Sequence, residues 1–214
     1  INVGLVKNVR PMNLTHTSYS AILLYLNNPS AWHSKYVLGI KDMQTTPAAL
    51  VGTAFHKYLE LLYKCFDEQE CKTSAIRVIT DCMDVDWGKT GSVEKALVDL
   101  EKLIGHYWKE FSNGLSFLPK RHNIISEVRL ENKIPGIKLP LKSFIDLVVE
   151  DEQGKIHLID WKTKRSLSES ISPSYYLQAV VYYLQAKKEY GNRVESMSFV
   201  EFKASVNRDG TQQV

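Results

Sequence analysis

The spacing of apolar side chains divides this 214-residue chain into a helical first half and a strand-rich second half. Apolar residues recur every three or four positions in the first half, which predicts helices over about 18–26, 30–37, 48–66 and 92–111. Ser18, Pro47 and Ser92 stand where these helices would begin, as capping residues and N-terminal prolines do. Residues 67–90 are acidic and mixed, and their pattern predicts no regular element.

The second half changes to short apolar runs separated by turn residues. These runs predict strands over about 124–130, 141–150, 155–162 and 197–203, with one long helix over 173–190 before the last strand. A β-β-β-α-β order predicts an α/β fold with a mixed sheet and helices packed on its faces. We therefore expect a single domain over 1–214, mainly helical over 1–112 and with a sheet-and-helix core over 113–214.

Composition adds little to this picture. With 27 Lys and Arg against 24 Asp and Glu, the formal net charge of +3 is compatible with nucleic acid but does not indicate it. The three cysteines share no metal-binding spacing, so we expect reduced thiols. The sequence shows neither an apolar run of about 20 residues nor a secretory signal. We therefore expect no membrane association and an intracellular location, in the cytoplasm or another DNA-containing compartment.

The chemistry is concentrated at the ends of two predicted strands. Asp146 and Asp160 each follow an apolar run. Side chains alternate along a strand, so Asp160 and Lys162 should share a face while Trp161 points the opposite way. A carboxylate and an ammonium at the end of a buried run are costly unless pairing or chemistry uses them. Two such acids beside a lysine indicate a divalent-cation site, for which phosphate esters are the usual substrates.

Two predicted helices carry polar residues at helical spacing. Gly52, His56 and Glu60 lie four residues apart, and so do Gln178 and Tyr182, so each set shares one helix face. Taken alone, each has an ordinary explanation: a satisfied histidine, a solvated acid, or a hydrogen bond in the core. The spacing gains weight only in combination with the two strand acids.

The order Gly52-x-x-x-His56-x-x-x-Glu60, Asp146, Asp160-x-Lys162, Gln178-x-x-x-Tyr182 resembles the RecB-like branch of the PD-(D/E)XK nuclease superfamily. The segments Ser18-Tyr19-Ser20 and Pro29-x-x-Trp32, with Tyr36, are also similar to that branch. The resemblance runs from about Leu14 to Lys203 and implies a restriction-endonuclease-like core.

The resemblance also implies roles for individual residues. His56, Asp146, Asp160 and the backbone carbonyl of Trp161 would bind Mg²⁺ or Mn²⁺. Lys162 would position or activate the attacking water and stabilise charge on the phosphate. Gln178 and Tyr182 would hold the nucleic acid and the active-site helix. Glu60 and Glu127 are further candidates for metal contacts through water.

The chain departs from the family pattern in three places. Lys142-Ser143-Phe144 precedes Asp146, where the family usually has a glycine. Asn28 stands where the first iron–sulfur cysteine is expected, and no cysteine follows Cys82, so we expect no iron–sulfur cluster. The helicase domain that often accompanies this nuclease is also missing from this chain.

The expected function is a stand-alone, Mg²⁺- or Mn²⁺-dependent deoxyribonuclease. An exonuclease acting on single-stranded DNA or DNA ends is favoured, in repair, recombination or replication and alongside proteins of those processes. The N-terminal helices could arch over the site and thread a strand. Trp32, Tyr36 and Trp87 could stack on bases, with core packing as the alternative. A flap or branch endonuclease and a silent DNA-binding subunit remain open, and the sequence indicates no oligomeric state.

Overall fold

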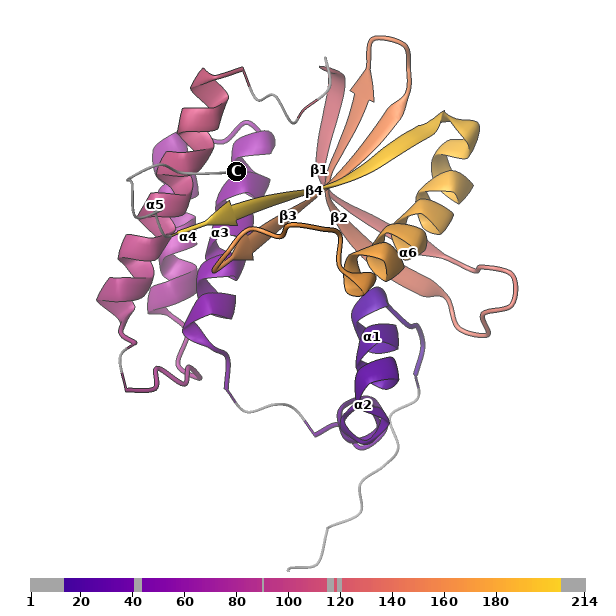
Figure 1. The fold of residues 1–214 in the computed structure, drawn as a ribbon, viewed down its shortest axis with the longest axis horizontal. Coiled ribbons are helices and arrows are strands. Elements are labelled where there is room, and N and C mark those ends of the chain that lie inside the picture. The colour runs from indigo at the N-terminus through magenta and orange to yellow at the C-terminus, as the bar shows by residue number, and fades with distance from the viewer. Residues whose placement is uncertain (1–13, 41–43, 90, 115–117, 119–120, 205–214) are drawn as a thin grey trace, which may run out of the picture.

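The computed structural model describes residues 14–40, 44–89, 91–114, 118 and 121–204. Two short helices, α1 (Tyr19–Asn27) and α2 (Pro29–Tyr36), come first (Figure 1). Three longer helices follow: α3 (Pro47–Tyr63), α4 (Glu68–Thr80) and α5 (Val93–Ser112). The sheet-forming half contains β1 (Arg121–Asn132), β2 (Leu141–Asp151), β3 (Ile156–Lys164), α6 (Pro173–Tyr190) and β4 (Val194–Lys203), with a 3₁₀ turn at Gly191–Arg193.

The four strands form one mixed sheet in the order β1-β2-β3-β4. The first three strands pair antiparallel, and α6 is the crossover that returns the chain to place β4 parallel to β3. This confirms the α/β fold with a mixed sheet flanked by helices. Helices α1, α3 and α5, whose N-caps are Ser18, Thr46 and Ser92, begin where the sequence predicted.

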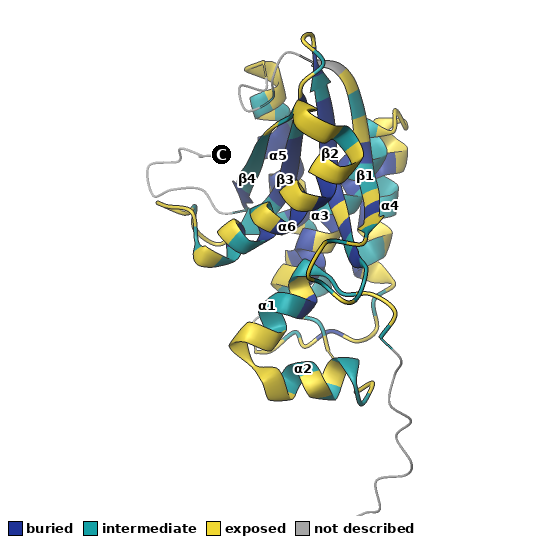
Figure 2. Cartoon of the chain, turned by 90° about the vertical axis from the view of Figure 1, so that its right-hand side faces the viewer, coloured by how far each residue is buried: buried dark blue, intermediate teal, exposed yellow. Residues whose placement is uncertain are grey.

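Helices cover both faces of the sheet (Figure 2). The larger core lies under α3, α4 and α5 and includes Leu147, Ile159 and Trp161 from the strands. The smaller core lies under α6 and includes Leu158 and Ile145. Leu158 and Ile159 therefore face opposite sides, as alternation in β3 requires. Trp161 is buried in the larger core, while Lys162 contacts Asp160, so the predicted division of faces at the end of β3 is correct.

The face alternation is broken at one point in both β1 and β2. Ser126 bonds to the α3 carbonyl of Glu60, whereas Val128, two residues on, packs in the core under α6. The backbone of Glu127 between them has a φ of 52°, a left-handed conformation that non-glycine residues rarely adopt. Across from Glu127, Ile145 and Leu147 also lie in opposite cores. In both strands, the side chains on either side of Glu127 and Asp146 therefore point to opposite faces of the sheet, where regular alternation would place them on the same face.

Two predictions for the helices are wrong. Residues 68–80 form α4, which was not predicted because its buried face consists of only Cys71, Ala75 and Ile79. Helix α3 ends at Tyr63 rather than at residue 66, since Cys65 has a φ of 63°. Val180 and Leu184, two apolar residues of α6, are 54% and 40% exposed.

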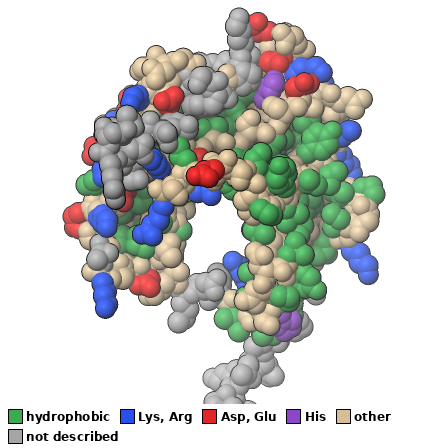
Figure 3. All heavy atoms as spheres, in the orientation of Figure 1, with side chains coloured by type: hydrophobic (Ala, Val, Ile, Leu, Met, Phe, Trp, Pro, Cys, Tyr) green, Lys and Arg blue, Asp and Glu red, His purple; other side chains and the backbone are tan. Residues whose placement is uncertain are grey.

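The space-filling view shows a hollow between two parts of the described chain, with α3 and its neighbours on one side and α6 with α1 on the other (Figure 3). None of the helices in the described part of the chain combines the length and the apolar character that crossing a membrane requires.

Candidate active site

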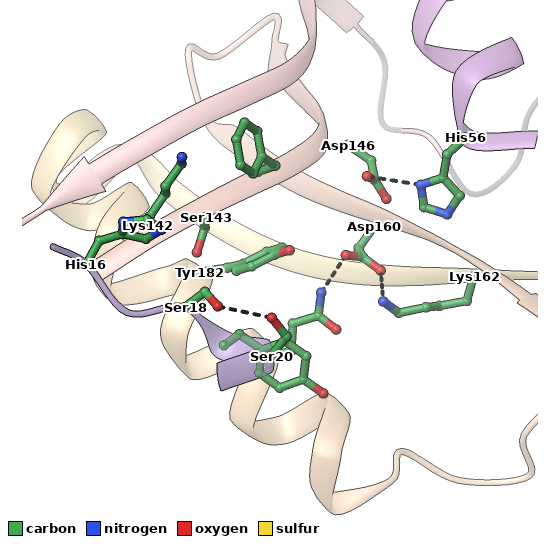
Figure 4. A pocket seen from close by; sticks show the side chains of 13 residues that line it. His16, Ser18, Ser20, His56, Lys142, Ser143, Asp146, Asp160, Lys162 and Tyr182 are labelled. Carbon is green, nitrogen blue, oxygen red and sulfur yellow. Dashed lines mark hydrogen bonds and ion pairs between the residues drawn. The ribbon is translucent and has the colours of Figure 1, made fainter. Parts of the chain in front are cut away.

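Six of the predicted site residues line a cavity of about 470 Å³ between α1, the strands β2 and β3, and α6, whereas Trp161, Glu60 and Glu127 do not line it. His56 comes from α3, Asp146 from β2, Asp160 and Lys162 from β3, and Gln178 and Tyr182 from α6 (Figure 4). Ser18, Tyr19 and Ser20 of α1 line the same cavity. Segments separated by more than a hundred residues therefore contribute to one site.

Asp146 is held from two directions. Its Oδ1 lies 3.3 Å from His56 Nδ1, and its Oδ2 accepts a 2.7 Å hydrogen bond from the backbone N–H of Trp161. The register that pairs Leu147 with Ile159 places Asp146 opposite Asp160 at the point where the β2–β3 pairing ends. The backbone bond fixes the carboxylate across this gap, because a charged acceptor strengthens a hydrogen bond.

A group able to hold a cation surrounds this carboxylate. One ligand atom from each of His56, Glu127 and Asp146 lies within 4.8 Å of the others. The left-handed backbone at Glu127 accompanies the exchange of strand faces described above. Backbone strain of this kind is found most often where function uses it. Glu127 was only a secondary candidate in the sequence, and the structure brings it beside His56 and Asp146.

Asp160 has different partners. Its Oδ1 accepts a 2.6 Å hydrogen bond from Gln178 Nε2, and its Oδ2 lies 2.5 Å from Lys162 Nζ. Asp160 and Gln178 are each only 3% exposed. The four-residue spacing in α6 therefore places an amide against the β3 carboxylate, and Tyr182 lines the cavity one turn further along.

Lys162 lies beside a stacked pair of aromatic rings that the sequence did not reveal. Its Nζ is 5.7 Å from the ring centroids of both Tyr175 and Phe199, which stack at 4.4 Å. The Tyr175 hydroxyl donates to Glu201 on β4 at 2.8 Å, and Ser168 donates twice more to that carboxylate. Glu201 thus fixes both the ring and the loop after β3. No spacing in the sequence relates these residues to Lys162.

The electrostatics of the site favour bound protons or a cation. Burial, then the charge of Asp146, raises the pKa of Asp160 to about 6 despite Lys162. Burial and the charges of Asp146 and Glu60 also raise the pKa of Glu127. Burial alone would lower the pKa of His56, but its bond to Asp146 and the two aspartate charges outweigh that effect and raise it. A divalent cation would relieve the same excess of negative charge.

The remaining residues of the predicted α3 motif have separate roles. A Cβ added at Gly52 would lie 2.7 Å from Thr163 Oγ1, so glycine permits α3 to cross closely over β3. Glu60 forms ion pairs with Lys57 and Lys64 and is not part of the group around Asp146.

The fold and this site together define an α/β protein with a candidate divalent-cation centre beside a lysine. The family model of the PD-(D/E)XK nuclease superfamily matches residues 16–213, nearly the whole chain. The chain belongs to this superfamily, whose members are metal-dependent nucleases.

Two further comparisons add less. No curated protein matches the chain. Among solved structures, the chain is similar to one described as "Crystal structure of SSO0001", with 16% identity, 86% of this chain and 73% of that chain covered, and a TM-score of 0.33.

Proposed function

We propose that this protein is a metal-dependent DNA exonuclease of the RecB-like branch, hydrolysing phosphodiester bonds of single-stranded DNA or DNA ends. The observation that carries the proposal is that one cavity is lined by His56 and Asp146, two members of the three-ligand group, and by the Asp160–Lys162 pair. We place its work in DNA repair, recombination or replication.

The donor set suits Mg²⁺ or Mn²⁺. His56, Asp146 and Glu127 would hold the ion, with Asp160 and the backbone carbonyl of Trp161 completing its shell. Carboxylate oxygens are the ligands that hard divalent cations prefer, and an imidazole nitrogen favours Mn²⁺ somewhat more than oxygen ligands alone would. Once bound, such an ion neutralises the phosphodiester and lowers the pKa of a bound water.

Lys162 would stabilise the charge that develops on the phosphate oxygens and orient the attacking water. Its ammonium pairs with Asp160 and lies near the Tyr175 and Phe199 rings. Gln178 would keep Asp160 in place during turnover through their 2.6 Å bond. Tyr182, on the wall of the cavity, would contact the nucleic acid.

The preference for an exonuclease comes from the resemblance to compact RecB-like nucleases with a histidine on this helix. The cavity lies between α1 and the sheet, beside the hollow between α3 and α6 (Figure 3). A single strand could reach the site from this hollow.

The test is cleavage of end-labelled linear single-stranded DNA beside its closed-circular form, with Mg²⁺, Mn²⁺ or EDTA. We expect loss of the linear form only, dependent on the metal, with the label position giving the polarity. Lys162→Ala should keep its fold and lower the rate by about 10²–10³, the cost typical of removing one such electrostatic contact. Lys155→Ala, on an exposed turn at the far end of β3, is the matched control.

Other outcomes lead to other functions. Cleavage of both DNA forms would identify an endonuclease. DNA binding without cleavage of either form would identify a silent binding subunit. A Lys162→Ala variant with the rate of the wild type would remove this lysine from the mechanism.

Metal binding can be tested apart from cleavage. Calorimetric titration of Mn²⁺ should show weaker binding to Asp146→Asn and to Asp160→Asn, because each substitution removes a charged oxygen donor. The loss should be greater for Asp146→Asn, since its carboxylate belongs to the three-ligand group. Unchanged affinity in both variants would mean that the metal binds elsewhere.

A further inference from the structure

A second groove, of about 790 Å³, lies on the other side of the end of β3. Its walls come from the start of α3, the first half of α5 and the segment 163–165 that ends β3. Lys162 lines the first cavity, and Thr163 and Lys164, its neighbours in the chain, line this groove. The end of β3 therefore separates two hollows that are within about 7 Å of each other along the strand.

The described lining of the groove is mainly basic. Four basic side chains lie along it against a single acidic one, Asp99: Lys95, Lys102, Lys164 and Arg165. Lys95 and Lys102 are exposed, and Lys102 Nζ lies 3.8 Å from Asp99 Oδ1 one turn away on the same helix. Exposed ion pairs of this kind are weak, so a phosphate can compete for the lysine. Lys164 Nζ lies 3.6 Å from Glu201 Oε1, and the same carboxylate accepts hydrogen bonds from Ser168 in the loop after β3. Thr46 and Ser92, which cap α3 and α5, also line the groove, so the positive ends of both helix dipoles face it.

The floor of the groove is apolar and carries an aromatic ring. Val51, Ala96 and Leu103 form part of it, and the half-buried Trp87 lies at one wall. The Gly91 N–H donates to the Trp87 carbonyl at 3.0 Å, and a Cβ at Gly91 would lie 2.3 Å from that oxygen. Glycine is therefore required for the turn that holds Trp87 beside the cap of α5. Basic rims with an aromatic platform are the usual construction of single-strand sites.

We propose that this groove binds the phosphate backbone of a single DNA strand, at the nucleotides next to those held in the catalytic cavity. This proposal rests on the proposed nuclease function, since the strand is taken to continue past Lys162 and over the end of β3. Lys95 and Lys102 of α5 would contact phosphates, and Trp87 would stack on a base. The groove would then set the length of strand that the protein holds.

The test measures binding of fluorescent oligothymidylates of about 4 and about 16 nucleotides, lengths that bracket typical single-strand footprints. EDTA prevents cleavage. The variant is the double substitution Lys95→Gln and Lys102→Gln. Its control, Lys72→Gln with Lys109→Gln, removes the same charge from one partly exposed and one exposed position outside the groove. Circular dichroism and thermal melting confirm that both variants fold.

We expect the groove variant to bind the long oligonucleotide about tenfold more weakly and the short one as well as the wild type does. For the long strand, the slope of log K against log salt concentration should become shallower by about 1.4, which is about 0.7 for each of the two lost phosphate contacts. Equal effects in the groove and control variants would overturn the proposal. The proposal would also be overturned if the groove bound thymidine monophosphate or inorganic phosphate while all variants bound the long oligonucleotide equally well.

The two proposals fail in different ways. If the protein never cleaves DNA but the groove variant still binds the long oligonucleotide more weakly, the nuclease proposal is refuted and the groove proposal is supported. A metal-dependent nuclease whose groove variant binds both lengths normally would refute the groove alone.

Discussion

At the scale of single residues, the site depends on one unusual backbone conformation. Glu127 adopts a φ of 52° where both strands exchange faces. Left-handed backbone costs a residue with a Cβ about 1–2 kcal/mol, and a β-branched residue more. We expect Glu127→Gly to keep or raise the melting temperature, because glycine adopts this conformation freely. Glu127→Val should lower it.

Mn²⁺ affinity provides the second measurement on these variants. Both should bind Mn²⁺ more weakly than the wild type, since both lose the carboxylate. A Glu127→Gly protein that melts well below Glu127→Val would show that the backbone conformation places no demand on this position. Unchanged Mn²⁺ affinity in both would exclude Glu127 from the metal site.

The sequence predicted some of these residues and not others. Asp146, Asp160 and Lys162 were found because charges at the ends of apolar strands are rare and costly. The position of Glu127 depends on a dihedral angle, which has no signature in a run of alternating residues. The contacts of Lys162 with Tyr175, Phe199 and, through Tyr175, Glu201 join three segments. Such a network exists only once the sheet has formed.

At the scale of elements, the crossing of α3 over β3 sets the position of His56. Gly52 lies one turn before His56 and faces Thr163. We expect Gly52→Ala to lower the free energy of unfolding by about 1–3 kcal/mol, the usual cost of overpacking. It should also weaken Mn²⁺ binding, because the helix that carries His56 must move away from Asp146.

A double-mutant cycle separates this contact from the loss of a glycine. Thr163→Ala removes the atom that a Cβ at Gly52 would meet, so the double variant should recover stability and Mn²⁺ affinity. Chemical denaturation of the four proteins gives the coupling energy, which is about 0.5–3 kcal/mol for residues in contact. Strict additivity of the two substitutions would contradict a direct clash.

Most elements could be predicted because their patterns are long and well capped. Helix α5 begins after the predicted cap Ser92, and helix α6 spans the predicted range 173–190. The β-β-β-α-β order limits the sheet to few topologies. Helix α4 was missed because its apolar stripe is narrow, although Asp67 caps it and Glu68 and Glu70 occupy its first turn. These acids are a helix start signal, which an acidic and mixed composition obscured.

At the scale of the whole molecule, the fold brings together acids whose charges repel in the absence of metal. The sheet places Asp146 and Asp160 on neighbouring strands where their pairing ends, and α3 adds His56 beside Asp146 and Glu127. The order of the strands was predictable, whereas this accumulation of charge depends on the packing of α3 against the sheet. Its consequence should be visible in the stability of the entire protein.

We expect the metal-free protein to lose stability as the pH rises. The pKa of Asp160 increases from 3.8 to about 6 on folding, so between those values the folded protein binds more protons than the unfolded chain. The free energy of unfolding therefore falls through this window as the pH rises. The raised pKa values of Glu127 and His56 act in the same direction and extend the fall toward neutral pH.

Melting temperatures in EDTA between about pH 4 and 8 test this expectation, because this range covers the window of Asp160, from 3.8 to about 6, and continues past neutral pH. Asp160→Asn should reduce the slope, because the amide has no proton to lose. Asp151→Asn should retain it, since the His157 bond lowers the pKa of Asp151 far from the site. Saturating Mn²⁺ should reverse the trend, because the metal binds the deprotonated, folded site and stabilises it by mass action. A flat profile in EDTA would mean that the acids do not share one charged centre.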